Sequence, residues 1–394
     1  MTDLEAFTKA EALFEKAFKH SPKIKEISYG RLEILGNHTD HQQGRCLVAT
    51  CSLGIRGYIE KADDKISINS DGYPLFSFSI NNLKKVESEK FTAKSLTRGV
   101  TNALARMGYK VGGFNASLTS DIFPGAGVSS SAAFELFIAE ALNYLYNDDK
   151  ISKMDMALAG QYAENVYFGK ASGLLDQCGS AYGGIAYLDF ADKNKPLVSP
   201  LVFPSNWDLA IILVNPGASH AGLSDLYSEM PFDMKNVAKT LFHKEVLGEV
   251  DETLFVDALS KGEEGLVSSR ALDRARHFYG EEKRVLRAKD AIISHNRDAF
   301  LELERETELS QETLLKNVMI PSKFSGSPLE AVMRANLFLK KGASRVMGGG
   351  LVGTTINFVP KDELLDFMDG MKRYYKENSI VEVKIPPLGA HIEK

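Results

Sequence analysis

The chain has 394 residues, of which 44% are hydrophobic and 25% are charged, and its formal net charge is -5. This composition is typical of a globular protein and excludes disordered, fibrous and membrane classes, while the length favours two domains. The negative charge offers no basic surface for nucleic acid or anionic lipid. We therefore expect a monomer that binds small molecules, with neither nucleic acid nor a membrane as a partner.

The N-terminal segment and the cysteines indicate where the protein works. Residues 1–18 carry charges at short intervals, which predicts an amphipathic helix and argues against a secretion signal. No uninterrupted apolar run is long enough to span a bilayer, so we expect a cytoplasmic protein. Cys46, Cys51 and Cys178 form no CxxC pair and are odd in number, which favours reduced thiols over disulfides or a zinc site.

Strands and helices alternate in the first half of the chain. Hydrophobic periodicity and turn residues predict the following elements in order: two strands around a glycine-rich loop (27–59), a strand and turn (65–78), a helix (93–107), a strand (114–118), a strongly apolar helix (132–146), a helix capped by Ser152, and a buried strand (183–190).

A proline-punctuated bridge at 196–204 marks the expected boundary between two domains, 1–200 and 201–394. Beyond it the pattern predicts an α+β sandwich. Its elements are a strand (209–214), three or four amphipathic helices (233–318), a helix (329–341), a strand (354–359), a helix (362–377) and a strand (380–385).

Residues 124–132 read Pro-Gly-Ala-Gly-Val-Ser-Ser-Ser-Ala between a predicted strand and the apolar helix. Glycines let the backbone approach a ligand, a helix start offers free N–H groups, and serines add hydroxyl donors and a metal ligand. The pattern predicts a phosphate-binding turn. A glycine turn with a serine cap is the alternative, but it needs fewer of these residues. A Walker-type NTPase is not expected, because the sequence has no GxxxxGK[ST].

Three further segments could carry chemistry. Residues 30–44 place a cation, two imidazoles, amides and a carboxylate between glycines, which suits polyol binding, although a polar hairpin loop explains the composition equally well. Within 169–177, Asp176 stands beside leucines, so it is either partnered in the fold or held for function. Residues 347–353 contain four glycines, which is more than a turn requires.

Taken in chain order, these four segments resemble the motifs of the GHMP kinase superfamily and, within it, of the galactokinases. The spacing of Glu164 and Asp176, and of His220 and Tyr227, is also similar to the pattern of that family. The resemblance implies an α+β fold of two domains, with a ribosomal-S5-domain-2-like α/β domain first and a ferredoxin-like domain second. The active site would lie in the cleft between them.

The resemblance also implies ATP-dependent phosphorylation of the anomeric hydroxyl of galactose, with Mg²⁺. Asp176 would accept the hydroxyl proton, and Arg31 beside it would keep it charged and stabilise the phosphoryl group. Ser131 and Glu164 would hold the metal ion. The nucleotide phosphates would bind to Gly125, Ala126, Gly127, Val128, Ser129, Ser130 and Ser131. The sugar would bind to Asn37, His38, Thr39, Asp40, Gly173 and Tyr227.

The first motif departs from the family at two positions, since Asn37 stands where galactokinases have Glu and His41 where they have Tyr. Two unit charges ~4 Å apart repel by roughly 4 kcal/mol at a surface-like dielectric, so the loss of a carboxylate would admit a substrate carboxylate. Galacturonate and N-acetylgalactosamine are alternative substrates. Lys170 is a candidate cation for galacturonate, although a solvated loop lysine is the better explanation of this residue. A non-catalytic galactose and ATP sensor is a rival interpretation, but the complete serine motif, Arg31 and Asp176 favour an enzyme. A mevalonate or homoserine kinase is disfavoured by the sugar motif.

Overall fold

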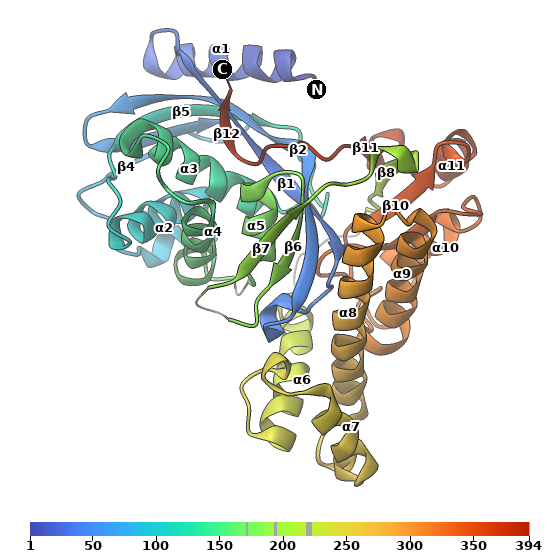
Figure 1. Cartoon of the computed structure of the whole chain (residues 1–394). Helices are drawn as coiled ribbons and strands as arrows, with labels where there is room; N and C mark the ends of the chain where they lie inside the picture. Colours follow the sequence, from blue (N-terminus) through green and yellow to red (C-terminus); the bar gives the residue numbers. More distant parts are fainter. Residues whose placement is uncertain (171, 193–194, 218–222, 394) are drawn as a thin grey trace.

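The computed structural model describes residues 1–170, 172–192, 195–217 and 223–393. Two sheets with helices packed around them make up this part of the chain (Figure 1). The elements of the first half are α1 (Asp3–Phe18), β1 (Ile24–Leu35), β2 (Arg45–Ala62), β3 (Lys65–Ser70), β4 (Phe76–Ser79), α2 (Ala93–Arg106), β5 (Gly113–Ser120), α3 (Ser130–Asn147), α4 (Lys153–Tyr162), α5 (Leu175–Tyr182), β6 (Ile185–Asp189) and β7 (Leu197–Leu201), and β7 lies within the expected bridge at 196–204.

The first sheet is built on the long hairpin of β1 and β2. Its strand order is β12-β1-β2-β5-β3-β4, and β6 and β7 extend it beside the other end of β2. Helices α2 to α5 cover one face and α1 covers the other (Figure 1). The core under α2 to α5 contains buried side chains such as Ile59, Phe114 and Phe137. Burial of each such side chain is worth roughly 1.5–3 kcal/mol, so this core holds the sheet and helices together.

The elements of the second half are β8 (Leu209–Val214), α6 (Ser224–Phe242), α7 (Glu252–Ser260), α8 (Ser269–Ile293), α9 (Arg297–Ser310), α10 (Pro328–Ala335), β9 (Ala343–Val346), β10 (Thr355–Pro360), α11 (Leu364–Met371), β11 (Ile380–Val383) and β12 (His391–Glu393). The second sheet is antiparallel in the order β11-β8-β10-β9. Numbered within the domain, this order is 4-1-3-2, which is that of a ferredoxin-like sheet.

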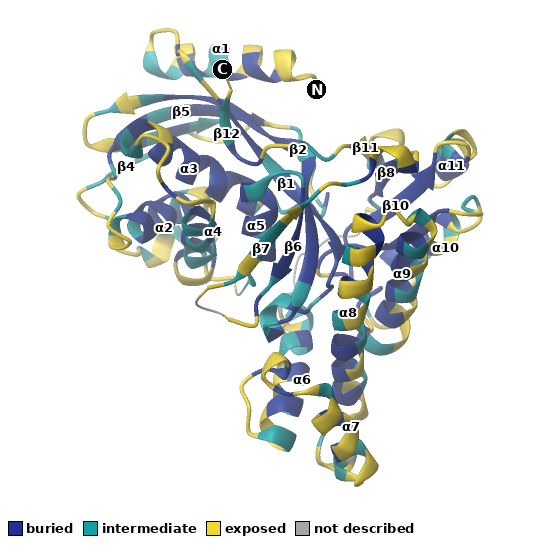
Figure 2. Ribbon diagram, in the orientation of Figure 1, coloured by how far each residue is buried: buried dark blue, intermediate teal, exposed yellow. Residues whose placement is uncertain are grey.

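The two sheets share a hydrophobic core. Leu32 and Ile34 of β1 belong to the same buried cluster as Phe300 of α9 and Phe358 of β10. Helices α6 and α7 pack around the far end of α8 as an arm whose inner faces are buried and outer faces exposed (Figures 1 and 2). Because apolar side chains fill the space between the sheets, β1 is held rigidly against the second domain.

Most elements expected from periodicity are present, and the differences lie where tertiary contacts decide. Helix α10 ends at Ala335, short of the expected 341, and α11 ends at Met371, short of 377. Periodicity did not predict α5, β7, β9 or β12, which are short. Strand β12 pairs with β1, so the last residues of the chain return to the first sheet and one cut near residue 200 does not separate the sheets.

The three cysteines are buried and free, as expected. In the part of the chain that the structure describes, no helix combines the length and apolar character that a membrane-crossing segment needs.

Candidate active site

Arg31 and Asp176 form an ion pair at the centre of the site. The register of β1 against β2 shifts between Tyr29 and Arg31, and a bulge of this kind redirects the side chain that follows it. Gly30 lies against the backbone of Val128, whose carbonyl accepts from the Arg31 amide at 2.8 Å. The Arg31 Nε donates to Asp176 Oδ1 at 2.8 Å. Two segments far apart in sequence therefore meet beside the serine motif.

The electrostatics of this pair keep Asp176 ionised. Burial raises its pKa, but the charges of Arg31 and Lys170 more than offset this, so the pKa lies below its usual value. Arg31 also donates from Nη1 to the carbonyl of Gly127 at 2.5 Å. Its guanidinium thus joins the carboxylate to the glycine and serine turn, which a lysine could not do in the same way.

The turn before α3 has the form expected of a phosphate-binding site. Gly125 and Gly127 have φ of 77° and 71°, and Ser129 has φ of 57°. Within the described residues, the Ser129 side chain makes no capping hydrogen bond to α3. The first N–H groups of this long helix therefore have no intrahelical acceptor and point to where an anion would bind. The Thr354 hydroxyl holds the turn from the second domain by donating to the Gly125 carbonyl at 2.6 Å.

Ser131 and Glu164, the expected metal ligands, contact each other. Ser131 Oγ donates to Glu164 Oε1 at 2.9 Å, and Glu164 lies in a π-helical turn, Ala163–Phe168, that continues α4. Glu164 Oε2 accepts from Gln177 Nε2 at 3.1 Å. Mg²⁺ prefers oxygen ligands and keeps several waters or phosphate oxygens, so two protein oxygens fit it. No cluster of three His, Cys, Asp or Glu able to hold a metal occurs among the described residues.

Lys170 lies at this end of the site. Its Nζ is 2.8 Å from Glu164 Oε1, and Glu164 is fully buried. The Lys170 ammonium therefore neutralises the carboxylate expected to hold the metal. Our sequence-based hypothesis that Lys170 faces a substrate carboxylate has no support in this geometry.

The third motif closes the site from the second domain. Gly348 lies next to Arg31 and Gly127, and Gly349 packs against the ring of Tyr227. Tyr227 donates from Oη to the carbonyl of Gly350 at 3.0 Å. Glycine is needed at 349 because this backbone approaches the Tyr227 ring closely, and it is favoured at 348 because φ there is positive. His220, whose spacing to Tyr227 also resembles the family, lies outside the described residues.

Asp40 and Gly173 form the part of the expected sugar site nearest to Asp176. A side chain at Gly173 would overlap the Asp40 carboxylate, so only glycine allows this approach. The His41 amide donates to Asp40 Oδ1 at 2.8 Å. Burial and then the charge of Asp176 raise the pKa of Asp40 to about 6. A pair of neighbouring carboxyls whose pKa values are pushed apart is typical of a functional site.

Asn37 lies behind the surface that a ligand could reach. Its side chain is fully buried, and its Nδ2 donates to Glu33 Oε1 at 2.9 Å and to the Gly348 carbonyl at 2.7 Å. Its Oδ1 accepts from Asn317 at 2.9 Å. Both of its N–H donors are thus used within the protein, so in this geometry Asn37 joins the first motif to the third.

Thr39 is fully buried as well, and its hydroxyl lies 2.6 Å from the carbonyl of Arg45, to which it donates. In this geometry Thr39 fixes the shape of the loop that carries Asp40. Asn37 and Thr39 were both expected at the sugar. The structure instead gives their polar groups partners inside the protein.

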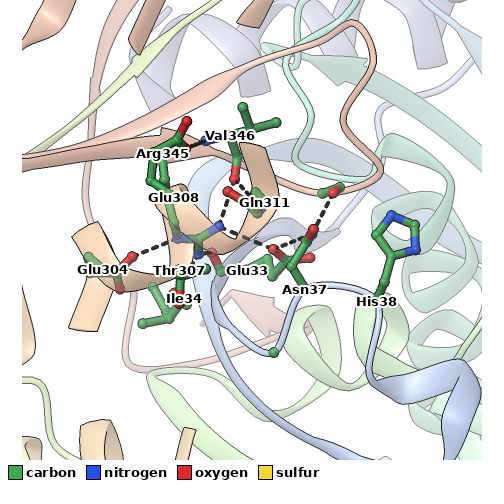
Figure 3. A network of polar contacts seen from close by, with 12 residues as sticks. Glu33, Ile34, Asn37, His38, Glu304, Thr307, Glu308, Gln311, Arg345 and Val346 are labelled. Carbon is green, nitrogen blue, oxygen red and sulfur yellow. Dashed lines mark hydrogen bonds and ion pairs between the residues drawn. The ribbon is translucent and has the colours of Figure 1, made fainter. Parts of the chain in front are cut away.

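A buried ionic network supports the loop from the second domain (Figure 3). Arg345 on β9 is fully buried, with Nε 2.6 Å from Glu304 Oε2 of α9 and Nη1 3.2 Å from Glu33 Oε1. Its Nη2 also donates to the carbonyls of Glu33 and Ile34. No local pattern in the sequence predicts the contacts of Glu33, Glu304 and Arg345, because these residues lie far apart in the chain.

Two family models match the chain within the first half. The galactose-binding signature of the galactokinases matches residues 12–61, which include the loop of Asp40. The N-terminal domain of the GHMP kinases matches residues 95–184, which include the phosphate-binding turn, Glu164 and Asp176. The chain is thus similar to the GHMP kinases and, in the segment around Asp40, to the galactokinases. The recognition made from the four motifs is therefore confirmed.

Similarity to known GHMP kinases extends over nearly the whole chain. A galactokinase from Clostridium tetani is 28% identical over 91% of this chain and 89% of the relative. One from Lactobacillus helveticus is 29% identical over 94% of each chain. The solved structure of Lactococcus lactis galactokinase complexed with galactose has a TM-score of 0.82 at 23% identity, covering 98% of this chain and 99% of the other. This likeness confirms the expected GHMP kinase fold of two domains.

Proposed function

We propose that this protein is a galactokinase, which transfers the γ-phosphoryl group of ATP to the anomeric hydroxyl of galactose. The observation that carries the proposal is the ion pair of Arg31 and Asp176, with Nε and Oδ1 2.8 Å apart, beside the turn before α3. The galactokinases that the chain resembles, and the galactose-binding signature around Asp40, favour galactose as the sugar.

In the proposed reaction the anomeric oxygen attacks the γ-phosphorus, the bond from phosphorus to the bridging oxygen breaks, and ADP leaves. The hydroxyl proton passes to the Asp176 carboxylate. A carboxylate with a lowered pKa is a weak base, so its main role is to orient the hydroxyl and to take the proton late. The Arg31 guanidinium keeps Asp176 charged and faces the turn on which the phosphates would lie.

The phosphates would bind to the glycine and serine turn, whose N–H groups are free of intrahelical acceptors. Mg²⁺, held by Ser131 and Glu164, would neutralise part of the phosphate charge when bound. Asp40, His38, Gly173 and Tyr227 would line the sugar, while Asn37 and Thr39 would shape the loop from behind. We expect no partner beyond the sugar, ATP and the metal ion.

The test is the variant Asp176→Asn, which keeps the size of the side chain but removes the proton acceptor. Turnover measured by ADP release with galactose should fall by roughly 10²- to 10⁴-fold. The circular dichroism spectrum should not change. Asp189→Asn is the matched control, because Asp189 also pairs with an arginine, Arg45, at 3.0 Å but lies outside the proposed site. Near-normal turnover of Asp176→Asn would refute the assignment.

A kinase for galacturonate or N-acetylgalactosamine is the second candidate. The observation in its favour is that residue 37 is a neutral amide, and that the nearby Glu33 carboxylate is paired with Arg345. No unpaired negative charge from these two residues would then repel a substrate carboxylate. The same assay across galactose, galacturonate, N-acetylgalactosamine, glucose and arabinose separates the candidates. Binding of galactose and ATP without ADP release would instead favour a sensor.

A further inference from the structure

A chain of hydrogen bonds runs from the helical arm into residues 36–44, the loop between β1 and β2 that we call the sugar loop, and ends at the third motif. The backbone N–H of Leu247 donates to Gln42 Oε1 at 3.1 Å. Gln42 Nε2 lies 3.0 Å from His41 Nδ1, and His41 Nε2 lies 3.0 Å from His38 Nδ1. His38 Nε2 lies 3.3 Å from the carbonyl of Gly349. Three side chains of the loop between β1 and β2, those of Gln42, His41 and His38, are thus linked in one line.

The two ends of this chain determine its direction. A backbone N–H can only donate and a carbonyl can only accept, so the roles of Leu247 and Gly349 are fixed. The Leu247 N–H therefore holds the Gln42 side-chain oxygen toward itself. The NH₂ group of Gln42 then faces His41 and must donate to His41 Nδ1. His41 then carries its hydrogen on Nε2 and donates to His38 Nδ1. His38 in turn carries its hydrogen on Nε2 and donates to Gly349.

The charge state of the two histidines agrees with this direction. Burial lowers the pKa of His38 to about 4, and burial together with His38 lowers the pKa of His41 well below its usual value. The cationic or titratable neighbours His277, Arg274 and Lys235 act in the same sense. Both rings are therefore neutral at neutral pH, as a chain in one direction requires.

We propose that His41 is a positioning residue for the sugar site, which holds His38 in the tautomer with hydrogen on Nε2. His38 then offers the substrate a hydrogen-bond donor and never an acceptor. Its contact with Gly349 is long, so the donor can turn to an oxygen of a bound sugar at small cost. The inference rests on the proposed function for the identity of the ligand, but the tautomers themselves do not depend on it.

His41 is one of the two positions at which the first motif departs from the galactokinase pattern, which has Tyr there. A tyrosine hydroxyl can donate or accept and so imposes no single tautomer on His38. The histidine, oriented by Gln42, imposes one. This departure therefore bears on which atoms of the sugar His38 can recognise, namely hydroxyl or carboxylate oxygens that accept a hydrogen bond.

The first experiment reads the tautomers directly, by nitrogen NMR of the protein labelled at histidine, without any substrate. We expect both His38 and His41 to be neutral with hydrogen on Nε2. The signals of the two rings are assigned by their loss in His38→Gln and His41→Phe. Hydrogen on Nδ1 of either ring, or a cationic ring at neutral pH, would overturn the proposal. Because no turnover is needed, a failure of the proposed kinase activity would leave this reading intact.

The second experiment compares His41→Phe, which removes both hydrogen bonds, with His41→Gln, which keeps an acceptor and a donor. Loss of one aligned hydrogen bond should raise KM for galactose about tenfold in His41→Phe, with kcat unchanged. His41→Gln should restore most of the affinity. The matched control His243→Phe, at an exposed histidine, should behave as wild type. Equal KM in His41→Phe and wild type, or equal loss in both His41 variants, would contradict the proposal.

Discussion

Arg345 and Glu33 lie 312 residues apart in the chain, yet Arg345 Nη1 and Glu33 Oε1 are 3.2 Å apart in the interior between the two sheets. Burial raises the pKa of Glu33 and of Glu304, and the Arg345 charge opposes this for both. The positive charge of the Arg345 guanidinium thus offsets the cost of burying two carboxylates. It ties β1, at the base of the sugar loop, to the second domain (Figure 3).

Removal of this cation should destabilise the protein. In Arg345→Met two buried carboxyls lose their partner, and we expect the free energy of unfolding to fall by about 3–5 kcal/mol. Denaturant titration measures the change. Arg373→Met, at an exposed arginine, is the control and should change stability little. A loss below about 1 kcal/mol in Arg345→Met would mean that the network is no stronger than a surface ion pair.

The pairing of Asn37 with Glu33 predicts the result of restoring the family residue. Asn37→Glu would place a second carboxylate against Glu33 in a fully buried position, so we expect a loss of several kcal/mol in the free energy of unfolding. Adding Glu33→Asn should recover much of it, because the two substitutions exchange the positions of amide and carboxylate. Asn378→Glu, at an exposed asparagine, controls for the added charge. Additive losses in the double variant would argue against direct coupling.

The raised pKa of Asp40 predicts a pH dependence of sugar binding. Above about 6 the carboxylate is ionised and would accept hydrogen bonds from the hydroxyls of the proposed sugar, whereas below about 6 it takes up a proton. KM for galactose should therefore rise as the pH falls through this value. Asp176, whose pKa is lowered, stays ionised over the same range. The Asp40→Asn variant should have a high KM that no longer varies with pH. If its KM still varied with pH, the pH dependence would belong to another titrating group.

Arg31→Lys tests whether charge alone suffices at the reaction centre. Lysine keeps the cation but cannot donate in fixed directions to both Asp176 and the Gly127 carbonyl. We expect kcat to fall on the order of 10³-fold, the range known for arginines that stabilise phosphoryl transfer. The far-ultraviolet circular dichroism should match wild type. Activity within a few fold of wild type would show that the directed hydrogen bonds of residue 31 matter less than its positive charge.

Lys170→Met tests the competition between the ammonium and a metal ion for Glu164. Without Lys170 the buried carboxylate loses its cationic partner and keeps only the hydrogen bonds from Ser131 and Gln177. The protein without nucleotide should therefore bind Mn²⁺, used as a probe for Mg²⁺, about two- to fivefold more tightly. Paramagnetic resonance measures free Mn²⁺ directly. Lys150→Met, at an exposed lysine, should bind as wild type. A changed preference between galactose and galacturonate in Lys170→Met would instead place Lys170 at the sugar.

Local patterns were sufficient for the elements that build the frame. The run at 209–214 is strand β8, and the apolar helix expected at 132–146 is α3, because strongly apolar segments are buried on most of their surface. The four motifs identified the superfamily for a similar reason. Glycines and serines next to a helix start create a ligand site through backbone geometry that adjacent residues alone determine.

The composition of the first motif could not say which of its side chains face a ligand. Asn37 and Thr39 have the same polar character as His38 and Asp40, but their partners, such as Asn317 and the Arg45 carbonyl, come from elsewhere in the fold. Burial decides their role, and burial depends on packing of the second domain. Strand β12 is similar, since three residues become a strand only through pairing with β1.

The sequence by itself determined the frame of the protein and its resemblance to a superfamily, and it singled out Arg31 and Asp176 as the proposed reaction centre. These follow from short-range periodicity and from motifs read in order. Only the tertiary structure decided which buried carboxylates are paired with a cation and which polar groups remain available to hydrogen-bond a substrate. It also decided the direction in which His41 and His38 donate their hydrogen bonds. Such properties arise from contacts between residues distant in the chain. Their strength depends on exclusion of water, which no local pattern encodes.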